Sequence, residues 1–538
     1  MVNMFQFVDV ISFSLLFVAS NSSIELIYQN QPLYTFYILL ITIFMYIIKY
    51  FLDNLNKGDF FLIHNFSCPL LLYTITKSNI SLGTQVSDLI KLFSILISIT
   101  GISIYILGEK VVISSFCIKY LYLFVIMVSF NFFTDSEINE IHSNHIVILS
   151  IIYYFVILKS ISFIIDKEEY YTKFGEFNIF SQLISSSFLF SLIKIIKINE
   201  KKSLEWESCI AHITFITEVL LPLIYFGMNT LLTDKTLNKI NHQNLYLRKV
   251  IDIALIILAV YFPVSYSIKI GIEVIDYIFK MILSSFSIRI LLLYWVFTVS
   301  ITILLLSSLN LTLISSTKRG KVILRKAFHL LVVLVFIPPI IIYKRSEGSK
   351  TDAECLLAFT VISIYVSSNL YIILEITRKC KAINGLTKVL NSVFILFIDM
   401  KDNLDGFVVT HICLLIGVSF PIIVEFSNHN SSQAFDVVSA AIGIATIGIG
   451  DTFSALVGVT FGSVSLPWNN NKTLFGMVSF IISTFTSLVI LCNISLNKYK
   501  YSDLFLVSFI SSILEAYTLQ IDNATIPLYT LAIYFNIR

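Results

Sequence analysis

The stretch that decides the fold is AFHLLVVLVFIPPIIIY, residues 327–343, which follows directly on the basic stretch KRGKVILRK, residues 318–326. The apolar stretch contains no Asp, Glu, Lys or Arg, and an α-helix needs about 17–25 predominantly apolar residues to cross a membrane. Lys and Arg gather in the loops on the cytosolic side of a membrane. We therefore predict a membrane-spanning helix that starts at the cytosolic face.

The composition of the whole chain agrees with this stretch. Of its 538 residues, 13% are charged and 57% are hydrophobic, whereas a soluble domain has about 25% charged residues. So few charges cannot cover the surface of a soluble globule, which excludes a soluble enzyme, a disordered chain and a nucleic-acid binder. Because a lipid-exposed strand would leave its backbone unsatisfied, we predict an all-α polytopic transmembrane helical bundle with roughly 13–17 spans.

The two parts of the chain differ in their polar residues. Residues 1–300 form a variable multi-span N-terminal membrane region with scattered charges, whereas polar residues and glycines cluster in residues 301–538. Chemistry in a membrane protein is expected where polar groups and broken helices occur, so we expect a functional core there with short or re-entrant helices. The candidate spans are 290–315, 327–343, 354–374, 407–424, 434–449, 474–492, 503–520 and 524–537, with 452–466 as a half-helix or re-entrant piece.

The basic residues fix the expected side of these spans. Lys and Arg crowd residues 318–326 and 378–388, and the two spans between them return the chain to the side from which it started. Counting onward along the predicted spans places Asp451, Lys472 and Asp522 on that same cytosolic face. Groups far apart in the sequence are thus expected to converge there.

The segment richest in reactive groups is GIGDTFSALVG, residues 448–458, which continues to a lysine and a threonine. Its glycines can adopt positive φ and let the backbone approach a ligand, Asp451 is placed to hold a divalent cation, and lysine and hydroxyl groups suit phosphate. The alternative is helix packing, with Gly458 and Gly462 as a GxxxG face. The candidate nucleotide-binding residues here are Gly448, Gly450, Thr452, Ser454, Gly458, Lys472 and Thr473.

A second polar segment is SILEAYTLQIDN, residues 512–523. Glu515, Thr518 and Asp522 have the spacing of one helical face. Two carboxylates on an apolar helix are costly to bury unless a shared cation or a basic partner offsets their charge. A structural polar ladder to a neighbouring helix is the alternative.

A third polar group lies at the start of the span 327–343. Arg325 and His329 are neighbours one helical turn apart, with Lys326 beside them, and the group suits an anion at the membrane surface. An anchor that only obeys the positive-inside rule is the alternative.

A fourth group is the acidic turn at residues 399–406, which contains Asp402 and Asp405. It can bind metal or orient a substrate, and a solvated loop is an equal alternative. His411 follows in the next span, where a lone histidine is more often a satisfied core residue than a base.

Six segments of the C-terminal half resemble the dolichol kinases, a family of multi-pass enzymes of the endoplasmic reticulum that phosphorylate dolichol with CTP. They occur in the family's order, and the fourth and the last are the most specific. The wider group includes polyprenol and phytol kinases and resembles the phosphatidate cytidylyltransferases. The segments are RKAFHLLVVLVFIPP (325–339), LEITR (374–378), THICLLIGVSFP (410–421), GDTFSALVG (450–458), KTLFG (472–476) and LEAYTLQIDNATIPLY (514–529).

The resemblance implies a CTP-dependent lipid kinase core at residues 301–538. It implies transfer of the γ-phosphoryl group of CTP to the terminal hydroxyl of dolichol, giving dolichyl phosphate, the lipid carrier for protein glycosylation. It also implies an endoplasmic-reticulum membrane location, an active site facing the cytosol, and CTP, the polyprenol lipid and the bilayer as partners, without nucleic acid. The oligomeric state is left open.

The resemblance also implies roles for the candidate residues. Asp451 and Asp522 would hold Mg²⁺ or another divalent cation, and Lys472, Arg325 and Lys326 would neutralise phosphate oxygens. Asp522 or Glu515 would complete the metal shell or accept the hydroxyl proton. The catalytic candidates are Asp451, Asp522, Glu515 and His329.

Other functions remain open at this point. A polyprenol or phytol kinase would use a different lipid alcohol, and a CTP-dependent phosphatidate cytidylyltransferase would release pyrophosphate and form a CDP-lipid. A secondary transporter would have inverted repeats and broken helices in both halves, whereas broken polar elements are predicted only in the C-terminal half.

Overall fold

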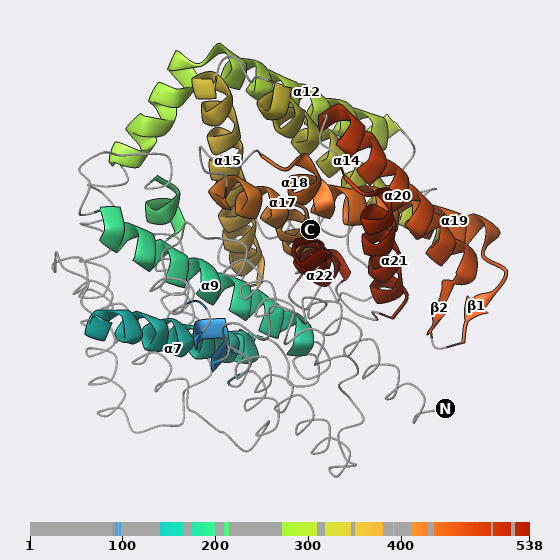
Figure 1. The fold of residues 1–538 in the computed structure, drawn as a ribbon, viewed down its shortest axis with the longest axis horizontal. Helices are drawn as coiled ribbons and strands as arrows, with labels where there is room; N and C mark the ends of the chain where they lie inside the picture. The colour runs from blue at the N-terminus through green and yellow to red at the C-terminus, as the bar shows by residue number, and fades with distance from the viewer. Residues whose placement is uncertain are drawn as a thin grey trace, which may run out of the picture.

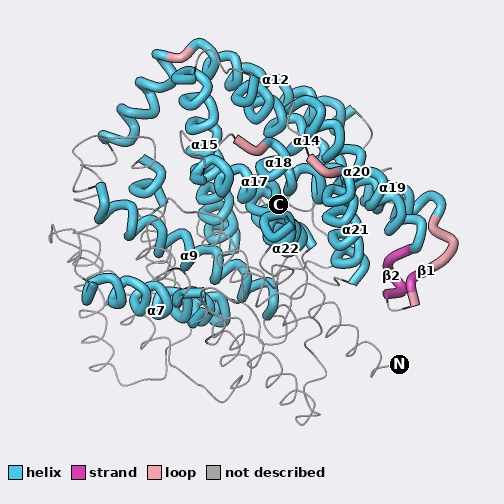
Figure 2. The backbone as a smooth tube through the Cα atoms, viewed as in Figure 1, coloured by secondary structure: helices cyan, strands magenta, loops and turns pink. Residues whose placement is uncertain are grey.

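Helices dominate the part of the chain that the computed structural model describes (Figure 1). One short hairpin accompanies them, at the edge of the bundle (Figure 2). The described residues are 90, 92–94, 96–97, 100, 140–164, 174–198, 209–214, 272–308, 318–345, 350–379, 391, 408, 410–428, 435–467, 469–495, 499–517 and 522–537.

The N-terminal region contributes two long helices, α7 (Glu140–Ile164) and α9 (Phe174–Ile198), which pack along each other. Tyr153 of α7 stacks on Phe188 of α9 with ring centroids 4.3 Å apart. The neighbouring Tyr154 donates its hydroxyl hydrogen to Asn178 Oδ1. An aromatic contact and a buried hydrogen bond therefore hold this pair together.

The C-terminal region is a bundle of helices with one antiparallel hairpin. Each candidate span predicted there corresponds to one helix, apart from 434–449. The elements are α12 (Phe286–Ser308), α14 (Lys318–Arg345), α15 (Lys350–Lys379), α17 (Thr410–Asn428), α18 (Val437–Gly443), the π-helix η4 (Ile444–Asp451), α19 (Thr452–Phe461), β1 (Ser465–Leu466), β2 (Asn469–Thr473), α20 (Leu474–Ser495), α21 (Tyr501–Tyr517) and α22 (Asp522–Ile537).

Several of these helices are long and apolar enough to cross a membrane. Among the described residues they are Arg325–Arg345, Asp352–Glu375, Val437–Phe461 and Leu474–Ile494, and a pair bent by 96°, Ile272–Ser284 with Phe286–Thr302, is a further candidate. The prediction of an all-α polytopic membrane protein is confirmed. The total of roughly 13–17 spans concerns the whole chain and stays a prediction.

The chain does not break where the sequence predicted a re-entrant piece. Residues 437–461 form one continuous helical stretch, in which α18, η4 and α19 follow one another. Inside a membrane a break would leave backbone groups unpaired, whereas the wider turns of a π-helix keep them bonded. The prediction of a span at 434–449 and a separate half-helix at 452–466 is therefore wrong.

The chain turns where the sequence predicted a single helical face. α21 and α22 pack against each other, with Ser511 Oγ 2.8 Å from Thr530 Oγ1. Glu515 belongs to α21 and Asp522 begins α22, so the prediction that these two carboxylates share one helical face is wrong, while Thr518 lies outside the described residues. Helical spacing reports a shared face only where one helix continues through all the residues concerned.

Two consecutive prolines, at 338–339, lie inside α14. A proline has no N–H, so each one leaves the carbonyl four residues earlier without its helical partner, here those of Leu334 and Val335. Tyr294 OH donates to the Leu334 carbonyl at 2.9 Å, and Trp295 Nε1 donates to the Val335 carbonyl at 3.0 Å. Both donors come from α12. An apolar surrounding offers no water to bond these carbonyl groups, so the two hydrogen bonds fix α12 to α14.

Proline shapes the packing of α17 in the same way. Pro421 in α17 frees the carbonyl of Gly417, and Pro527 in α22 frees that of Asn523. Gly443 of α18 lies against the first carbonyl and Gly417 against the second, so closely that a Cβ at either glycine would overlap the oxygen. Cα–H···O contacts are weak partners that suit such carbonyls. α17 therefore packs tightly between α18 and α22.

We expect Tyr294→Phe to destabilise the protein by about 1–3 kcal/mol, because the Leu334 carbonyl loses its donor. Thermal unfolding of the purified protein in detergent measures the change. Tyr371→Phe is the matched control, since Tyr371 is exposed on α15 and its loss should cost less than about 0.5 kcal/mol. Equal shifts for the two variants would contradict the role of this hydrogen bond.

We also expect Gly417→Ala to destabilise the protein by about 1–3 kcal/mol or more, because the added methyl group forces α17 and α22 apart. Ser419→Ala, two residues on, is the control: its hydroxyl bonds only within α17, to the Leu415 and Ile416 carbonyls. The same unfolding measurement separates the two variants. A Gly417→Ala protein as stable as Ser419→Ala would show that the α17–α22 contact is not tight.

Candidate functional site

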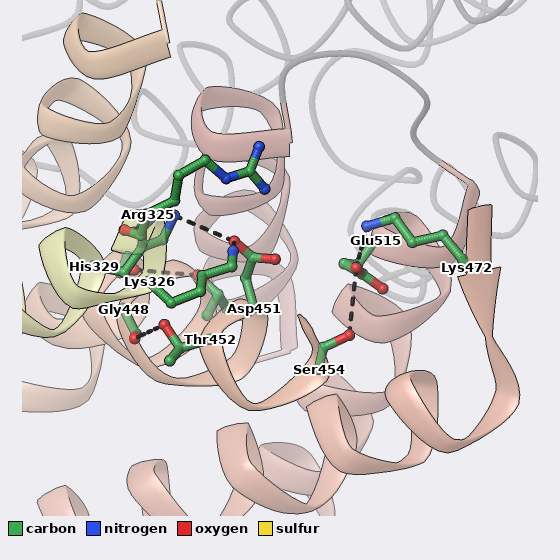
Figure 3. A network of polar contacts seen from close by, with 11 residues as sticks. Arg325, Lys326, His329, Gly448, Asp451, Thr452, Ser454, Lys472 and Glu515 are labelled. Atoms are coloured by element: carbon green, nitrogen blue, oxygen red, sulfur yellow. Dashed lines mark hydrogen bonds and ion pairs between the residues drawn. The ribbon is translucent and has the colours of Figure 1, made fainter. Parts of the chain in front are cut away.

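Charged side chains of α14 and η4 meet inside the C-terminal bundle (Figure 3). Lys326 Nζ donates to Asp451 Oδ2, and His329 Nε2 lies 3.3 Å from the same oxygen. Lys326 and His329 lie one turn apart on α14, and Asp451 is the last residue of η4. Because α14 and η4 pack against each other, the helix contact itself brings these groups together.

This ion pair is almost completely removed from solvent. Asp451 is 4% exposed and Lys326 is 5% exposed. A buried charge that loses its partner destabilises a protein by several kcal/mol. Each of the two charges therefore depends on the other.

His329 is held by its own helix. Its Nδ1 lies 3.1 Å from the carbonyl oxygen of Arg325, one turn earlier, while its Nε2 faces Asp451 without forming a hydrogen bond. Figure 3 shows the Arg325 side chain extending on the same side of α14 as Lys326, beyond the Asp451 carboxylate. Lys326 and His329 thus both face the Asp451 carboxylate.

The two carboxylate oxygens of Asp451 differ in their contacts. Oδ2 carries both contacts, and Oδ1 accepts no hydrogen bond from any described residue. Within the described part of the chain, no three His, Cys, Asp or Glu side chains form a metal-binding group. Mg²⁺ is usually bound by one or two carboxylates together with substrate phosphates and water, and not by an all-protein cage. The single carboxylate oxygen therefore fits a magnesium ion that arrives with a phosphate ligand.

A second ion pair lies beside the first (Figure 3). Lys472 of β2 pairs with Glu515 of α21, and Ser454 Oγ of α19 donates to Glu515 Oε1 at 3.5 Å. Asn469 Nδ2 donates to the carbonyl oxygen of Ala516 at 3.2 Å. The hairpin is therefore docked on α21 by two of its side chains, those of Asn469 and Lys472.

The two pairs belong to one site. Asp451 and Ser454 are one turn apart on the same continuous helix, and Lys472 is close enough to Asp451 for their charges to interact. The predicted site residues that the structure brings together are Arg325, Lys326, His329, Asp451, Ser454, Lys472 and Glu515.

Two predicted hydroxyl ligands bond to nearby backbone. Thr452 Oγ1 donates to the Gly448 carbonyl at 2.7 Å, within the helix. Thr473 Oγ1 accepts the N–H of Gly476 at 3.2 Å, which is the bond of an N-cap residue at the start of α20. Whether either hydroxyl also meets a nucleotide stays a prediction.

The predicted glycines serve contacts between helices. Gly448 and Gly450 have helical backbone inside η4, so the expectation of a positive φ is wrong. A Cβ at Gly448 would overlap Val333 of α14, and one at Gly450 would overlap Thr484 of α20. Gly458 lies against the end of β2, which agrees with the alternative that this glycine serves packing. At these positions the glycines let their helix lie close to a neighbouring helix or to the strand β2.

Four predicted residues fall outside what the structure describes. Asp402 and Asp405 lie outside the described residues. The side chains of Asp522 and His411 are likewise not described, although Asp522 begins α22 and His411 lies in the first turn of α17. Their roles stay predictions.

A buried cluster at the end of α15 was not predicted. Arg378 donates from Nε and Nη2 to the two oxygens of Glu375 at 2.7 and 2.6 Å, and from Nη1 to Asn391 Oδ1 at 3.2 Å. Glu375 Oε1 also accepts the N–H of Val408 at 2.6 Å. The available signal was a pair of opposite charges three residues apart on one helix. The cluster ties α15 to the chain just before α17.

A second unpredicted cluster surrounds Asp436, directly before the start of the 437–461 helix. Its carboxylate accepts the N–H groups of Val438 and Ser439 as an N-cap, and the hydroxyls of Tyr499 and Tyr534. An Asp directly before an apolar run is a known helix-start signal. This cluster fixes the far ends of α18, α21 and α22.

The fold and the site define a multi-pass helical membrane protein with paired charges buried between its helices. The chain is similar to the dolichol kinases of Mus musculus and Homo sapiens, with 32% identity over 253 residues in each case. The match covers 45% of this chain and 44% of each of those proteins. Dolichol kinase EVAN of Arabidopsis thaliana is 28% identical over 244 residues, which is 44% of this chain and 38% of that protein.

The chain thus matches less than half the length of these curated relatives. No family model matches the chain, and no solved structure matches it.

We expect Lys326→Met to destabilise the protein by about 3–5 kcal/mol, because Asp451 would keep a buried charge without a partner. The double variant Lys326→Met/Asp451→Asn removes that charge and should recover most of the loss. Thermal unfolding of the purified variants measures both.

The control for this cycle is an exposed ion pair. Lys280 and Asp276 have side chains 73% and 56% exposed, so Lys280→Met should cost less than about 1 kcal/mol. A double variant as unstable as Lys326→Met alone would show that the pair is not the source of the effect.

Proposed function

We propose that this protein is a dolichol kinase, which transfers the γ-phosphoryl group of CTP to the terminal hydroxyl of dolichol. The observation that carries the proposal is the meeting of the Lys326–Asp451 and Lys472–Glu515 pairs in one buried site, in a membrane protein similar to proteins named dolichol kinase. A phosphoryl donor requires cations for its phosphates, and a polyprenol acceptor requires a site within the membrane.

Phosphoryl transfer depends more on positioning and charge neutralisation than on covalent chemistry. In the proposed mechanism Lys326, Arg325 and Lys472 bind phosphate oxygens of CTP. Asp451, through Oδ1, would hold Mg²⁺ together with these phosphates. The ion, when bound, neutralises charge on the phosphoryl oxygens. These groups come from α14, η4 and β2, so the packing of the bundle orients the nucleotide.

The acceptor hydroxyl needs a group that takes its proton. Glu515 is engaged with Lys472 and Ser454, so we assign this role to Asp522, at the start of α22. The terminal hydroxyl of the lipid would reach the site from the surrounding bilayer.

The proposed location is the membrane of the endoplasmic reticulum, with the site facing the cytosol. The basic stretch 318–326 contains Lys326 itself, and Lys and Arg near the ends of spans favour the cytosolic side. CTP, a soluble and charged donor, is reached from that side.

We expect Asp451→Asn to lower the rate of dolichol phosphorylation by about 10²–10³-fold, the range for the loss of one charge-stabilising group. Because Asp451→Asn also leaves the buried Lys326 charge without its carboxylate, a lower folded yield is expected as well, and the rate is compared per amount of folded protein. Membranes containing the protein, dolichol and γ-labelled CTP provide the assay, with labelled lipid monophosphate as the readout.

Asp503→Asn is the matched control, since Asp503 lies in the first turn of α21, at the opposite end from Glu515, and should leave the rate unchanged. Size-exclusion chromatography compares the folded yields. A CDP-lipid formed from phosphatidic acid and α-labelled CTP, with no label in dolichol, would replace the kinase by a cytidylyltransferase.

A further inference from the structure

Resting on the proposed function, we propose that Glu515 is a positioning residue: it holds the Lys472 ammonium group in place for the phosphates of the nucleotide and neither binds the metal nor accepts the hydroxyl proton. The sequence suggested either of those two other roles. The contacts of Glu515 favour a different one.

The carboxylate of Glu515 is directed at a lysine and a hydroxyl group. Lys472 Nζ and Ser454 Oγ both meet Oε1, and Figure 3 shows the three side chains converging from β2, α19 and α21. The side chain of Glu515 is 3% exposed, whereas that of Lys472 is 23% exposed. The carboxylate is thus the more buried partner, and the lysine side chain is the partly exposed one.

Lys472 needs such a partner because of its own chemistry. A lysine carries a point charge on a flexible four-carbon stem and loses about 2 kcal/mol of rotamer freedom when it is fixed. A buried carboxylate that already holds the ammonium group reduces the cost of ordering it when phosphate arrives. The lysine has further donor hydrogens, so it can contact a phosphate oxygen while it remains bonded to Glu515.

The surrounding backbone fixes the relative position of the two residues. Asn469 Nδ2 donates to the carbonyl of Ala516, the residue after Glu515. Ser512 Oγ donates to the carbonyl of Met477 at 3.1 Å, which joins α21 to the first turn of α20. Bonds on both sides of Lys472 along the chain therefore set the hairpin against α21.

The same contacts argue against a metal at Glu515. A divalent ion bound to this carboxylate would lie beside the Lys472 ammonium group and would be repelled by it. Glu515 is held by a hydroxyl group as well as by its lysine, whereas Asp451 accepts a hydrogen bond from one described residue, Lys326. The two carboxylates therefore have different roles: Asp451 would hold the metal ion, and Glu515 holds Lys472.

The test begins with the wild-type full-length protein in nanodiscs, assayed for dolichol phosphorylation with γ-labelled CTP. For Glu515→Gln we expect the KM for MgCTP to rise about 10- to 100-fold, the range for losing a hydrogen bond to a charged group. The KM for dolichol and the Mg²⁺ concentration for half-maximal rate should stay within about twofold. Glu515→Asp should fall between the wild type and Glu515→Gln.

A double-variant cycle shows whether Glu515 acts through Lys472. Lys472→Gln should raise the KM for MgCTP, and Lys472→Gln/Glu515→Gln should be no worse than Lys472→Gln alone. The double variant also removes both charges of the pair, so it keeps the test valid if Glu515→Gln folds poorly. Glu354→Gln, at an exposed carboxylate of α15, is the control and should match the wild type.

Three kinetic results would overturn the proposal: additive losses in the cycle, a raised Mg²⁺ requirement in Glu515→Gln, or a lower kcat with an unchanged KM for MgCTP. Equilibrium binding of labelled MgCTP, measured without dolichol, separates this proposal from the proposed function. If the wild type binds MgCTP but does not phosphorylate dolichol, the kinase proposal fails, and weaker binding by Glu515→Gln still supports the positioning role. Equal binding by the two proteins would overturn it.

Discussion

The packing of the C-terminal bundle depends on carbonyl groups that proline deprives of their helical partners. In lipid no water can bond to such a group, so the protein must supply a neighbour. Tyr294 and Trp295 donate to two carbonyls of α14. Gly443 and Gly417 lie against the carbonyls that proline leaves unpaired in α17 and α22. The resulting contacts join α12 to α14, α18 to α17, and α17 to α22. They limit how far these helices can slide along one another.

This rigidity matters because the site is built from charges that cannot tolerate displacement. α14 runs antiparallel to the 437–461 helix: Tyr343 meets Phe435 with ring centroids 4.8 Å apart at one end, and Lys326 meets Asp451 at the other. An aromatic contact thus fixes one end of the helix pair and an ion pair the other. A shift of either helix would separate two charges that are buried together, which costs several kcal/mol.

The site joins parts of the chain that are far apart in sequence. Lys326 and Asp451 are 125 residues apart, and Lys472 and Glu515 are 43 residues apart. Two lysines and two carboxylates give this core of the site no net charge, which limits the penalty of burying it. Arg325 adds a positive charge on the same side of α14 as Lys326. Such an arrangement suits a polyanionic donor that brings its own divalent cation, as in phosphoryl transfer.

The sequence by itself determined that the protein is an all-α membrane protein and where its C-terminal helices lie, because apolar length and the absence of charge are properties of a single segment. It also singled out Asp451 and Glu515, since carboxylates in apolar runs stand out, and Lys326 and Lys472 as cations suited to phosphate. Only the tertiary structure decided which lysine meets which carboxylate, because side-chain pairing between segments depends on how whole helices pack. It also decided the continuous helix at 437–461 and the separation of Glu515 from Asp522. Periodicity describes a face within one helix and cannot show where that helix continues or turns.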